Sequence, residues 1–223
     1  MIATWDALLA AEARAVELFA LSTPLVVPGK TERQLSDEVA AIAAERFGVS
    51  KFWHKKIVRA GANTLRVYAA NPPDLTIGED DILFFDFGPV FGDWEADYGR
   101  TFVVGDDPNK HRLAADIARA WDDGAAFVRD RPGVTSAELY AYVSGLARAG
   151  GWEFGHVHCG HLVGKFPHER TEPDDDTNHL YGTNELPLRR AGNAGEPLQW
   201  ILEIHFVDRA AGYGGFQEAL LPT

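Results

Sequence analysis

Residues 82–105 read ILFFDFGPVFGDWEADYGRTFVVG, two runs rich in Phe, Val, Ile and Leu on either side of a Gly-containing turn. This pattern predicts an antiparallel hairpin. Directly opposed residues in such a pair have a constant sum of positions, so Asp86 faces Asp97 if the turn is centred between Phe91 and Gly92. Opposed carboxylates on neighbouring strands lie roughly 5 Å apart at Cβ and repel each other. We therefore expect a cation between them.

The same construction recurs near the C-terminus, where Glu203 in WILEIHFV and Glu218 in GGFQEALL flank a turn centred between Ala210 and Ala211. The two hairpins supply four carboxylates, and His161 adds an imidazole. Donors of these types can hold two divalent ions about 3.5 to 4 Å apart, and such a pair can activate a water. An acid beside a turn is often only a solvated surface residue. Two hairpins with paired acids and a suitable histidine favour a metal site.

The composition is that of a globular protein with a sizeable core, since 46% of the 223 residues are hydrophobic. We expect a single domain over residues 1–223. A net charge of −12 argues against nucleic acid or an anionic membrane as partner, because both require clustered Lys and Arg. The single cysteine, Cys159, excludes an intrachain disulfide, and no spacing signature supports it as a catalytic thiol. Without a secretory signal pattern, a cytoplasmic location is expected.

A short motif occurs twice, as PGKTERQL at residues 28–35 and PGVTSAEL at residues 132–139. In each copy the threonine, Thr31 or Thr135, stands where it can cap a helix, with Gln or Glu three residues on. This arrangement predicts a capping box that opens a helix of about 15 residues. The offset of the two copies is close to half the chain, which indicates a duplication.

The hydrophobic periodicity around the motif has the same order in both halves. We expect helices over 4–21 and after Thr31, strands over 56–70 and 82–104, helices over 109–130 and after Thr135, and strands over 153–164 and 198–221. Pseudo-repeats of about 1–105 and 106–223 therefore predict an α+β protein with one central sheet and helices outside.

The acidic motifs resemble those of the pita-bread metallopeptidase family, which includes methionine aminopeptidase, aminopeptidase P, prolidase and creatinase. The resemblance rests on DFGPVFGDWEADYGRT at residues 86–101, on GHLVG with His161 and His168 seven residues apart, on Glu203 and on Glu218. It covers nearly the whole chain and is closest in pattern to Xaa-Pro peptidases. It implies the pita-bread fold, a duplicated helix-helix-strands unit with a pseudo-twofold central antiparallel sheet.

The resemblance also implies roles for individual residues. It assigns Asp86 to one metal, His161 and Glu203 to the other, Asp97 and Glu218 to both, and His168 to contact with the substrate carbonyl. A metal-bound water would be the nucleophile, and Glu203 would accept and pass on its proton. Manganese is the first choice by analogy, and cobalt, iron or zinc also suit these donors.

Three residues bear on the substrate. Tyr68 stands where prolidase-like members carry a histidine, and tyrosine does not titrate near neutrality. His54, in FWHKKIV, can fold back to replace that group or belong to an edge strand. His205 shares strand parity with Glu203, so it is either a contact within the site or a packed histidine.

We therefore expect a dinuclear metal-dependent hydrolase, an aminopeptidase or Xaa-Pro dipeptidase that acts on small peptides. Two alternatives stay open. One is a non-peptidase enzyme of the same fold, a creatinase-like amidine hydrolase or a lyase, which Tyr68 favours. The other is a catalytically inactive binding module. The sequence begins just ahead of the first helix, without the N-terminal domain of prolidase, which predicts another oligomeric arrangement. A homodimer is the candidate.

Overall fold

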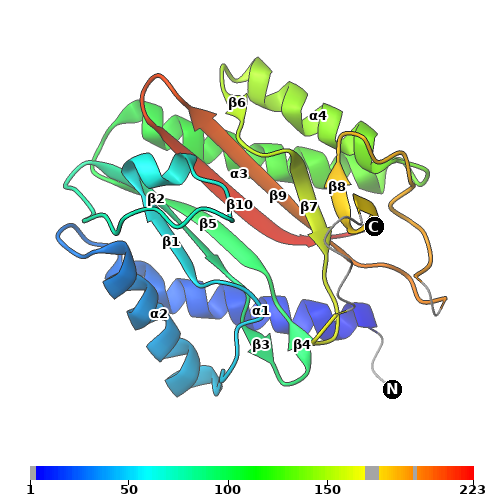
Figure 1. Cartoon of the computed structure of the whole chain (residues 1–223), viewed down its shortest axis with the longest axis horizontal. Coiled ribbons are helices and arrows are strands. Elements are labelled where there is room, and N and C mark those ends of the chain that lie inside the picture. The colour runs from blue at the N-terminus through cyan, green and yellow to red at the C-terminus, as the bar shows by residue number, and fades with distance from the viewer. Residues whose placement is uncertain (1–3, 169–175, 193–194) are drawn as a thin grey trace.

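An antiparallel sheet runs through the middle of the molecule (Figure 1). The computed structural model describes residues 4–168, 176–192 and 195–223. The strand order is β1-β2-β5-β10-β9-β7-β8, with β6 paired to β9 and a separate small hairpin of β3 and β4. The strands are β1 (Ile57–Ala60), β2 (Asp81–Phe87), β3 (Val90–Phe91), β4 (Trp94–Glu95), β5 (Tyr98–Val104), β6 (Glu153–Phe154), β7 (His158–Leu162), β8 (His179–Tyr181), β9 (Trp200–Asp208) and β10 (Tyr213–Leu221).

The helices follow the expected order, two in each half of the chain. They are α1 (Thr4–Ser22), α2 (Glu32–Phe47), α3 (Pro108–Arg129) and α4 (Ser136–Ala149), with the short 3-10 helices η1 (Thr23–Leu25), η2 (Gly61–Leu65) and η3 (Asp176–Asn178). Both predicted capping boxes are present, at Thr31 and at Thr135. The expected duplicated α+β unit is confirmed. Among the helices of residues 4–168, 176–192 and 195–223, none has the length and apolarity needed to cross a membrane.

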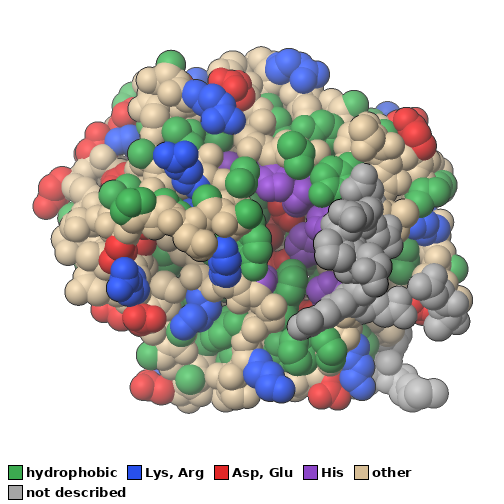
Figure 2. All heavy atoms as spheres, viewed as in Figure 1, with side chains coloured by type: hydrophobic (Ala, Val, Ile, Leu, Met, Phe, Trp, Pro, Cys, Tyr) green, Lys and Arg blue, Asp and Glu red, His purple; other side chains and the backbone are tan. Residues whose placement is uncertain are grey.

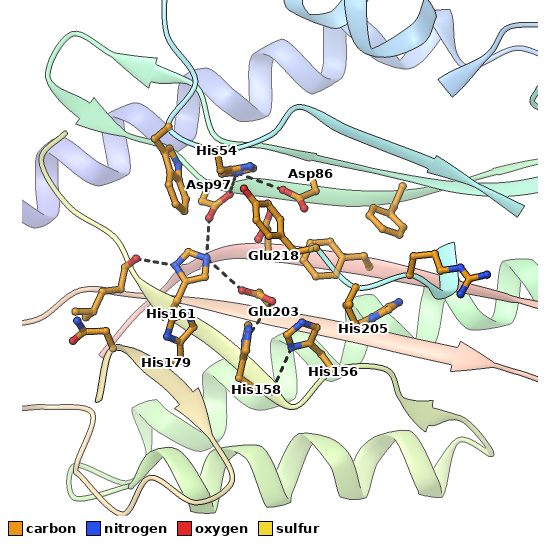
Figure 3. Close-up of a pocket in the computed structure, with 18 of the residues that line it drawn as sticks. His54, Asp86, Asp97, His156, His158, His161, His179, Glu203, His205 and Glu218 are labelled. Carbon is orange, nitrogen blue, oxygen red and sulfur yellow. Dashed lines mark hydrogen bonds and ion pairs between the residues drawn. The ribbon is translucent and has the colours of Figure 1, made fainter. Parts of the chain in front are cut away.

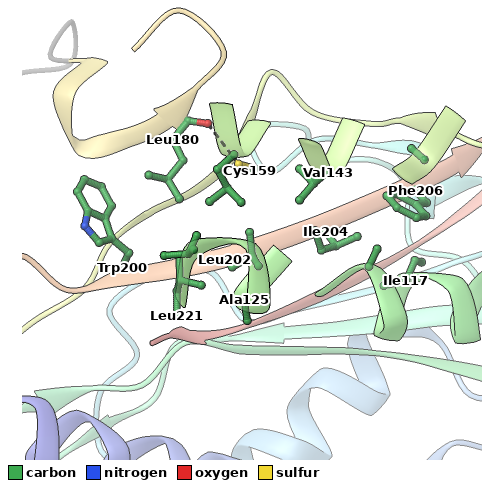
Figure 4. Packing of buried hydrophobic residues seen from close by; sticks show 14 of the residues in the cluster. Ile117, Ala125, Val143, Cys159, Leu180, Trp200, Leu202, Ile204, Phe206 and Leu221 are labelled. Atoms are coloured by element: carbon green, nitrogen blue, oxygen red, sulfur yellow. Dashed lines mark hydrogen bonds between the residues drawn. The ribbon is translucent and has the colours of Figure 1, made fainter. Parts of the chain in front are cut away.

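The two faces of the sheet have different partners because side chains alternate along each strand. On β9, Leu202, Ile204 and Phe206 are buried in the core beneath α3 and α4 (Figure 4). On β2, Phe85 and Phe87 are buried against α1 and α2. The residues between them, including the acids, point to the opposite face. The helices therefore cover one face of the sheet and leave the other for a site.

The register of the first hairpin differs from the expected one. Asp86 lies opposite Gly99, two positions beyond the predicted partner Asp97. The pairings of β2 with β5 and of β3 with β4 centre the turn between Gly92 and Asp93, one residue further along than predicted. Gly92 adopts a φ of +65°, which a residue without Cβ accepts readily, and the turn sets the register. In contrast, Glu203 lies directly opposite Glu218, as predicted.

Two segments were assigned wrongly from their patterns. The strand expected over 56–70 ends at Ala60, where the chain turns into η2. The buried Glu32 carboxylate accepts hydrogen bonds from the Ala60 N–H at 2.6 Å and from Asn63 Nδ2, which holds this turn in place. The stretch between the strands expected over 153–164 and 198–221 contains β8 and η3, which the pattern does not predict. The structure of both segments depends on hydrogen bonds to residues that are distant in the chain. Hydrophobic periodicity carries no information about such bonds.

The two capping boxes can be tested by the same substitution in both halves of the chain. Thr31→Ala and Thr135→Ala should each lower the free energy of unfolding by about 1 kcal/mol, because each removes the oxygen that accepts the N–H three residues on. Urea unfolding followed by circular dichroism measures this, with Thr→Ser at the same positions as the control that keeps the oxygen. An unchanged free energy for either alanine variant would contradict the role given to that cap.

Candidate metal centre

Three of the acids lie close together because the register of four neighbouring strands places them, with one glycine, in a single row across the sheet. Asp86 of β2 lies opposite Gly99 of β5, Gly99 opposite Glu218 of β10, and Glu218 opposite Glu203 of β9. Gly99 is the member of the row without a side chain, which lets Asp86 and Glu218 approach each other across β5. A Cβ at this position would lie 2.9 Å from the Phe216 ring and 3.0 Å from Glu218 Cγ. The row therefore depends on glycine at position 99.

Asp97 lies just before β5 and bridges two histidines (Figure 3). Its Oδ1 is 2.9 Å from His54 Nε2, and its Oδ2 is 3.1 Å from His161 Nε2. His54 Nε2 is also 3.5 Å from Asp86 Oδ1, and His161 Nε2 is 3.3 Å from Glu203 Oε1. All five predicted ligands are thus gathered at one place, and His54 joins them.

A bulge in β7 turns two histidines to the same side. His158 pairs with Tyr181, but His161 pairs with His179, so the register shifts by one residue between them. A bulge of this kind re-aims side chains that regular alternation would separate. Gly160 lies within it at a φ of +147°, where a Cβ would come 1.9 Å from the Ile201 carbonyl oxygen. Both histidines therefore line the same pocket.

The four carboxylates are buried, with 2 to 8% of each residue exposed. Burial raises the pKa of Asp86, raises that of Glu203 to about 7, and raises that of Glu218 well above its usual value, with the neighbouring acids adding to the rise. Burial also opposes ionisation of Asp97, but the two imidazoles beside it lower its pKa below the usual range. Within the described chain Glu218 Oε1 is buried without a hydrogen-bond partner.

This arrangement fits divalent cations. Carboxylates that repel one another in a buried place are stabilised when positive charge lies between them. Two sets of donor atoms each lie within 4.8 Å of one another: His54, Asp86, Asp97 and Glu218 form one set, and His161, Glu203 and Glu218 the other. Oxygen and imidazole nitrogen donors in these numbers suit two transition-metal ions.

His168 lines the same pocket and is held by an acid that the sequence reasoning missed. Its Nδ1 lies 2.6 Å from Glu95 Oε2, and its backbone N–H also donates to Glu95. Glu95 is 1% exposed and accepts a further hydrogen bond from the Gly164 N–H. Trp53 packs edge-on against the His168 ring, with centroids 5.3 Å apart. Glu95 and Trp53 thus hold the ring, and within residues 4–168, 176–192 and 195–223 its Nε2 has no hydrogen-bond partner.

The substrate-side residues expected from the sequence, Tyr68, His54 and His205, all line the pocket. Tyr68 lies at the rim and is 45% exposed. His205 is buried, and its Nε2 lies 2.8 Å from the Thr64 carbonyl oxygen. Burial lowers the pKa of His205 to about 4. His205 therefore has a structural contact as well as a place in the pocket wall.

Further histidines complete the wall, namely His156, His158 and His179. The sequence offered little signal for them, because their approach depends on the β7 bulge and on β8. Figure 2 shows histidine and acidic side chains gathered in a hollow on this face, with hydrophobic side chains around it. Cys159 lies in the core cluster, fully buried, and burial raises the pKa of its thiol. It has no part in this pocket.

A model of Metallopeptidase family M24 matches residues 6–194, so the chain belongs to this family. Comparison with curated proteins gave no match. Three solved structures illustrate the similarity, each with a TM-score of 0.77. They are the prolidase from Pyrococcus horikoshii (19% identity, covering 97% of this chain and 58% of that one), a dipeptidase from Mycobacterium ulcerans (26%, 97% and 54%) and the X-Pro aminopeptidase from Thermotoga maritima (17%, 96% and 56%).

These comparisons confirm the predicted family and the pita-bread fold. The chain spans little more than half the length of these three proteins.

A substitution at Gly99 tests the row of acids and leaves every metal-donor side chain unchanged. Gly99→Ala should weaken Mn(II) binding by about 10- to 100-fold, the range found when groups that support metal ligands are altered. The new Cβ would force Glu218 and Phe216 to shift. Isothermal titration calorimetry of the metal-free protein measures the effect. Gly133→Ala is the matched control, since a Cβ there meets nothing within 4 Å. Equal affinity in both variants would contradict the requirement for glycine in the row.

Proposed function

We propose that this chain is a metallopeptidase that uses two divalent ions to cleave a peptide bond, as an aminopeptidase or Xaa-Pro dipeptidase. The observation that carries the proposal is the row of buried acids across four strands, flanked by His161 and facing an open pocket. Membership of the M24 family supports the same activity. The names of the similar structures, prolidase, dipeptidase and X-Pro aminopeptidase, support a small peptide as the substrate.

The residues that would hold the ions follow from the two donor sets. Asp86 would bind one ion, His161 and Glu203 the other, and Asp97 and Glu218 would lie between them. When bound, such ions lower the pKa of water and polarise a carbonyl group. Manganese is the first metal to try, with cobalt, iron and zinc next.

The chain's own residues would supply the proton handling and the orientation of the substrate. Glu203 directs Oε1 to His161 and Oε2 toward the pocket-lining His158, 3.8 Å from its Nδ1. Oε2 is therefore the atom suited to accept a proton from the nucleophile and pass it on. His168, oriented by Glu95, would present Nε2 to the substrate carbonyl.

The walls of the pocket favour a small apolar side chain beside the cleaved bond. Phe84, Leu162 and Phe216 line it together with Val67 and Tyr68 at the mouth. An apolar pocket with a few fixed polar groups is typical of a small-ligand site. A peptide bond next to proline or another small residue is therefore the first-choice substrate. The single-domain organisation, a homodimer and a cytoplasmic location stay predictions.

Turnover of a panel of Xaa-Pro and Xaa-Ala dipeptides tests the activity. Protein reconstituted with Mn(II) should release free amino acids, and Asp97→Ala should abolish the release because it removes the carboxylate between the two sites. Bound metal without cleavage of any peptide would contradict the peptidase and favour an amidine hydrolase or lyase of the same fold. A protein that binds no metal would favour the inactive binding module.

The role of Glu95 gives a second kinetic test. Glu95→Gln should lower kcat by about 10- to 100-fold, since a loosened acid-base or electrostatic group loses part of a contribution of about 10² to 10⁴. Metal stoichiometry should not change, because Glu95 belongs to neither donor set. Glu153→Gln is the matched control, as Glu153 forms a surface ion pair with Arg209 at 3.1 Å. An unchanged kcat in Glu95→Gln would contradict the positioning of His168.

A further inference from the structure

We propose that His54 is a direct ligand of the ion held by Asp86, Asp97 and Glu218, so that each of the two ions has one imidazole ligand. The inference rests on the metal centre of the proposed function and adds a residue outside the five implied by the family resemblance. It also changes the role expected for His54, from a substrate contact to a metal ligand.

The hydrogen bonds of the His54 ring leave one nitrogen for a metal. Nδ1 lies 2.6 Å from the Lys55 carbonyl oxygen, so it donates its hydrogen there. Nε2 is therefore the nitrogen that faces Asp97 Oδ1 at 2.9 Å and Asp86 Oδ1 at 3.5 Å. It meets these oxygens either with a second ring proton, as an ion pair, or with its lone pair on a cation that they also bind. Acceptors that converge in this way need a positive group between them. A metal-bound histidine typically donates its other N–H to a backbone carbonyl or a carboxylate, which is the arrangement here.

The ring of His161, a predicted ligand, has the same pattern of contacts as the ring of His54. Its Nδ1 lies 2.8 Å from the carbonyl oxygen of the next residue, Leu162, just as that of His54 lies near Lys55. Its Nε2 faces two carboxylates, those of Asp97 and Glu203. The two oxygens of Asp97 therefore each face one histidine. This symmetry supports the same role for both imidazoles.

The surrounding chain holds His54 in place and makes room for it. The Trp53 backbone N–H donates to the Gly88 carbonyl, and Trp53 Nε1 donates to the Ala96 carbonyl, both at 2.9 Å. A Cβ at Gly88 would come 2.3 Å from His54 Cδ2. The His54 side chain is 6% exposed. Position, orientation and burial are thus determined by the fold, as a metal ligand requires.

An added nitrogen ligand has a consequence for metal choice. Carboxylate-only sites suit Mg²⁺ and Mn²⁺, whereas imidazole suits Zn²⁺, Fe²⁺ and Ni²⁺ and, in the same series, Co²⁺. With His54 among its ligands, the ion at Asp86 should prefer Co(II) over Mn(II) more strongly than three carboxylates alone would allow. Loss of His54 should therefore weaken Co(II) binding more than Mn(II) binding.

Metal titration of the metal-free protein tests the proposal without any assay of activity. Calorimetry should give two Co(II) ions for the wild type. In His54→Ala and in the bulkier His54→Gln one of the two should bind at least tenfold more weakly, and the visible absorption of bound Co(II) should change. In His54→Gly, added imidazole should restore both the affinity and the spectrum, which a purely structural role would not explain. His111→Ala, which changes an exposed histidine on α3, is the matched control.

The outcomes separate the two proposals. Two ions bound by His54→Gln and His54→Ala with wild-type affinity and spectrum would overturn the ligand role and leave the metallopeptidase intact. The same holds if imidazole fails to rescue His54→Gly while its thermal unfolding matches that of the wild type. A wild-type protein that binds no metal would overturn the proposed function itself.

Discussion

The repulsion among four buried carboxylates governs how the strands and glycines around them are arranged. Asp86, Asp97, Glu203 and Glu218 converge where they are almost fully buried, and burial together with the neighbouring acids raises the pKa of Asp86 and of Glu218. Histidines approach from β7 and from the segment before β1, but the acids outnumber the imidazoles that contact them. Divalent cations would balance the charge, and the open pocket above them would give a substrate access to them.

The two faces of the one sheet have different roles: one face forms the apolar core, and the other holds the polar site. Helices cover the face formed by Phe85, Leu202 and their neighbours, and this packing supplies the apolar burial that stabilises the fold. The other face is left to polar groups. Backbone positions without side chains then bring these groups into contact, since Gly99 lets Glu218 reach Asp86 and Gly88 accommodates His54. Core and site are therefore built from alternate residues of the same strands.

The sequence predicted those features of the site that depend on residues close together in the chain. The register of Glu203 and Glu218 was predicted correctly because a short turn joins two long strands. The register at Asp86 was predicted wrongly because Gly92 moved the turn, although parity still placed Asp97 on the same face. The family resemblance supplied the ligand set as a whole.

Other features depend on contacts between distant segments and leave no local pattern. Glu95 reaches His168 from a two-residue strand, 73 positions away in the chain. His158 and His179 meet the pocket only through a bulge and a three-residue strand. His54 lies in a segment without regular structure, where Trp53 fixes its position through hydrogen bonds to the hairpin. Such placements require the tertiary structure.

Anomalous X-ray diffraction from crystals of the protein grown with Mn(II) tests whether the converging acids share metal ions. Two anomalous peaks about 3.5 to 4 Å apart are expected. One should lie among Asp86, Asp97 and Glu218, and the other among His161, Glu203 and Glu218. No peak among these side chains, or peaks only at the surface of the molecule, would contradict the claim that the acids converge to share metal ions.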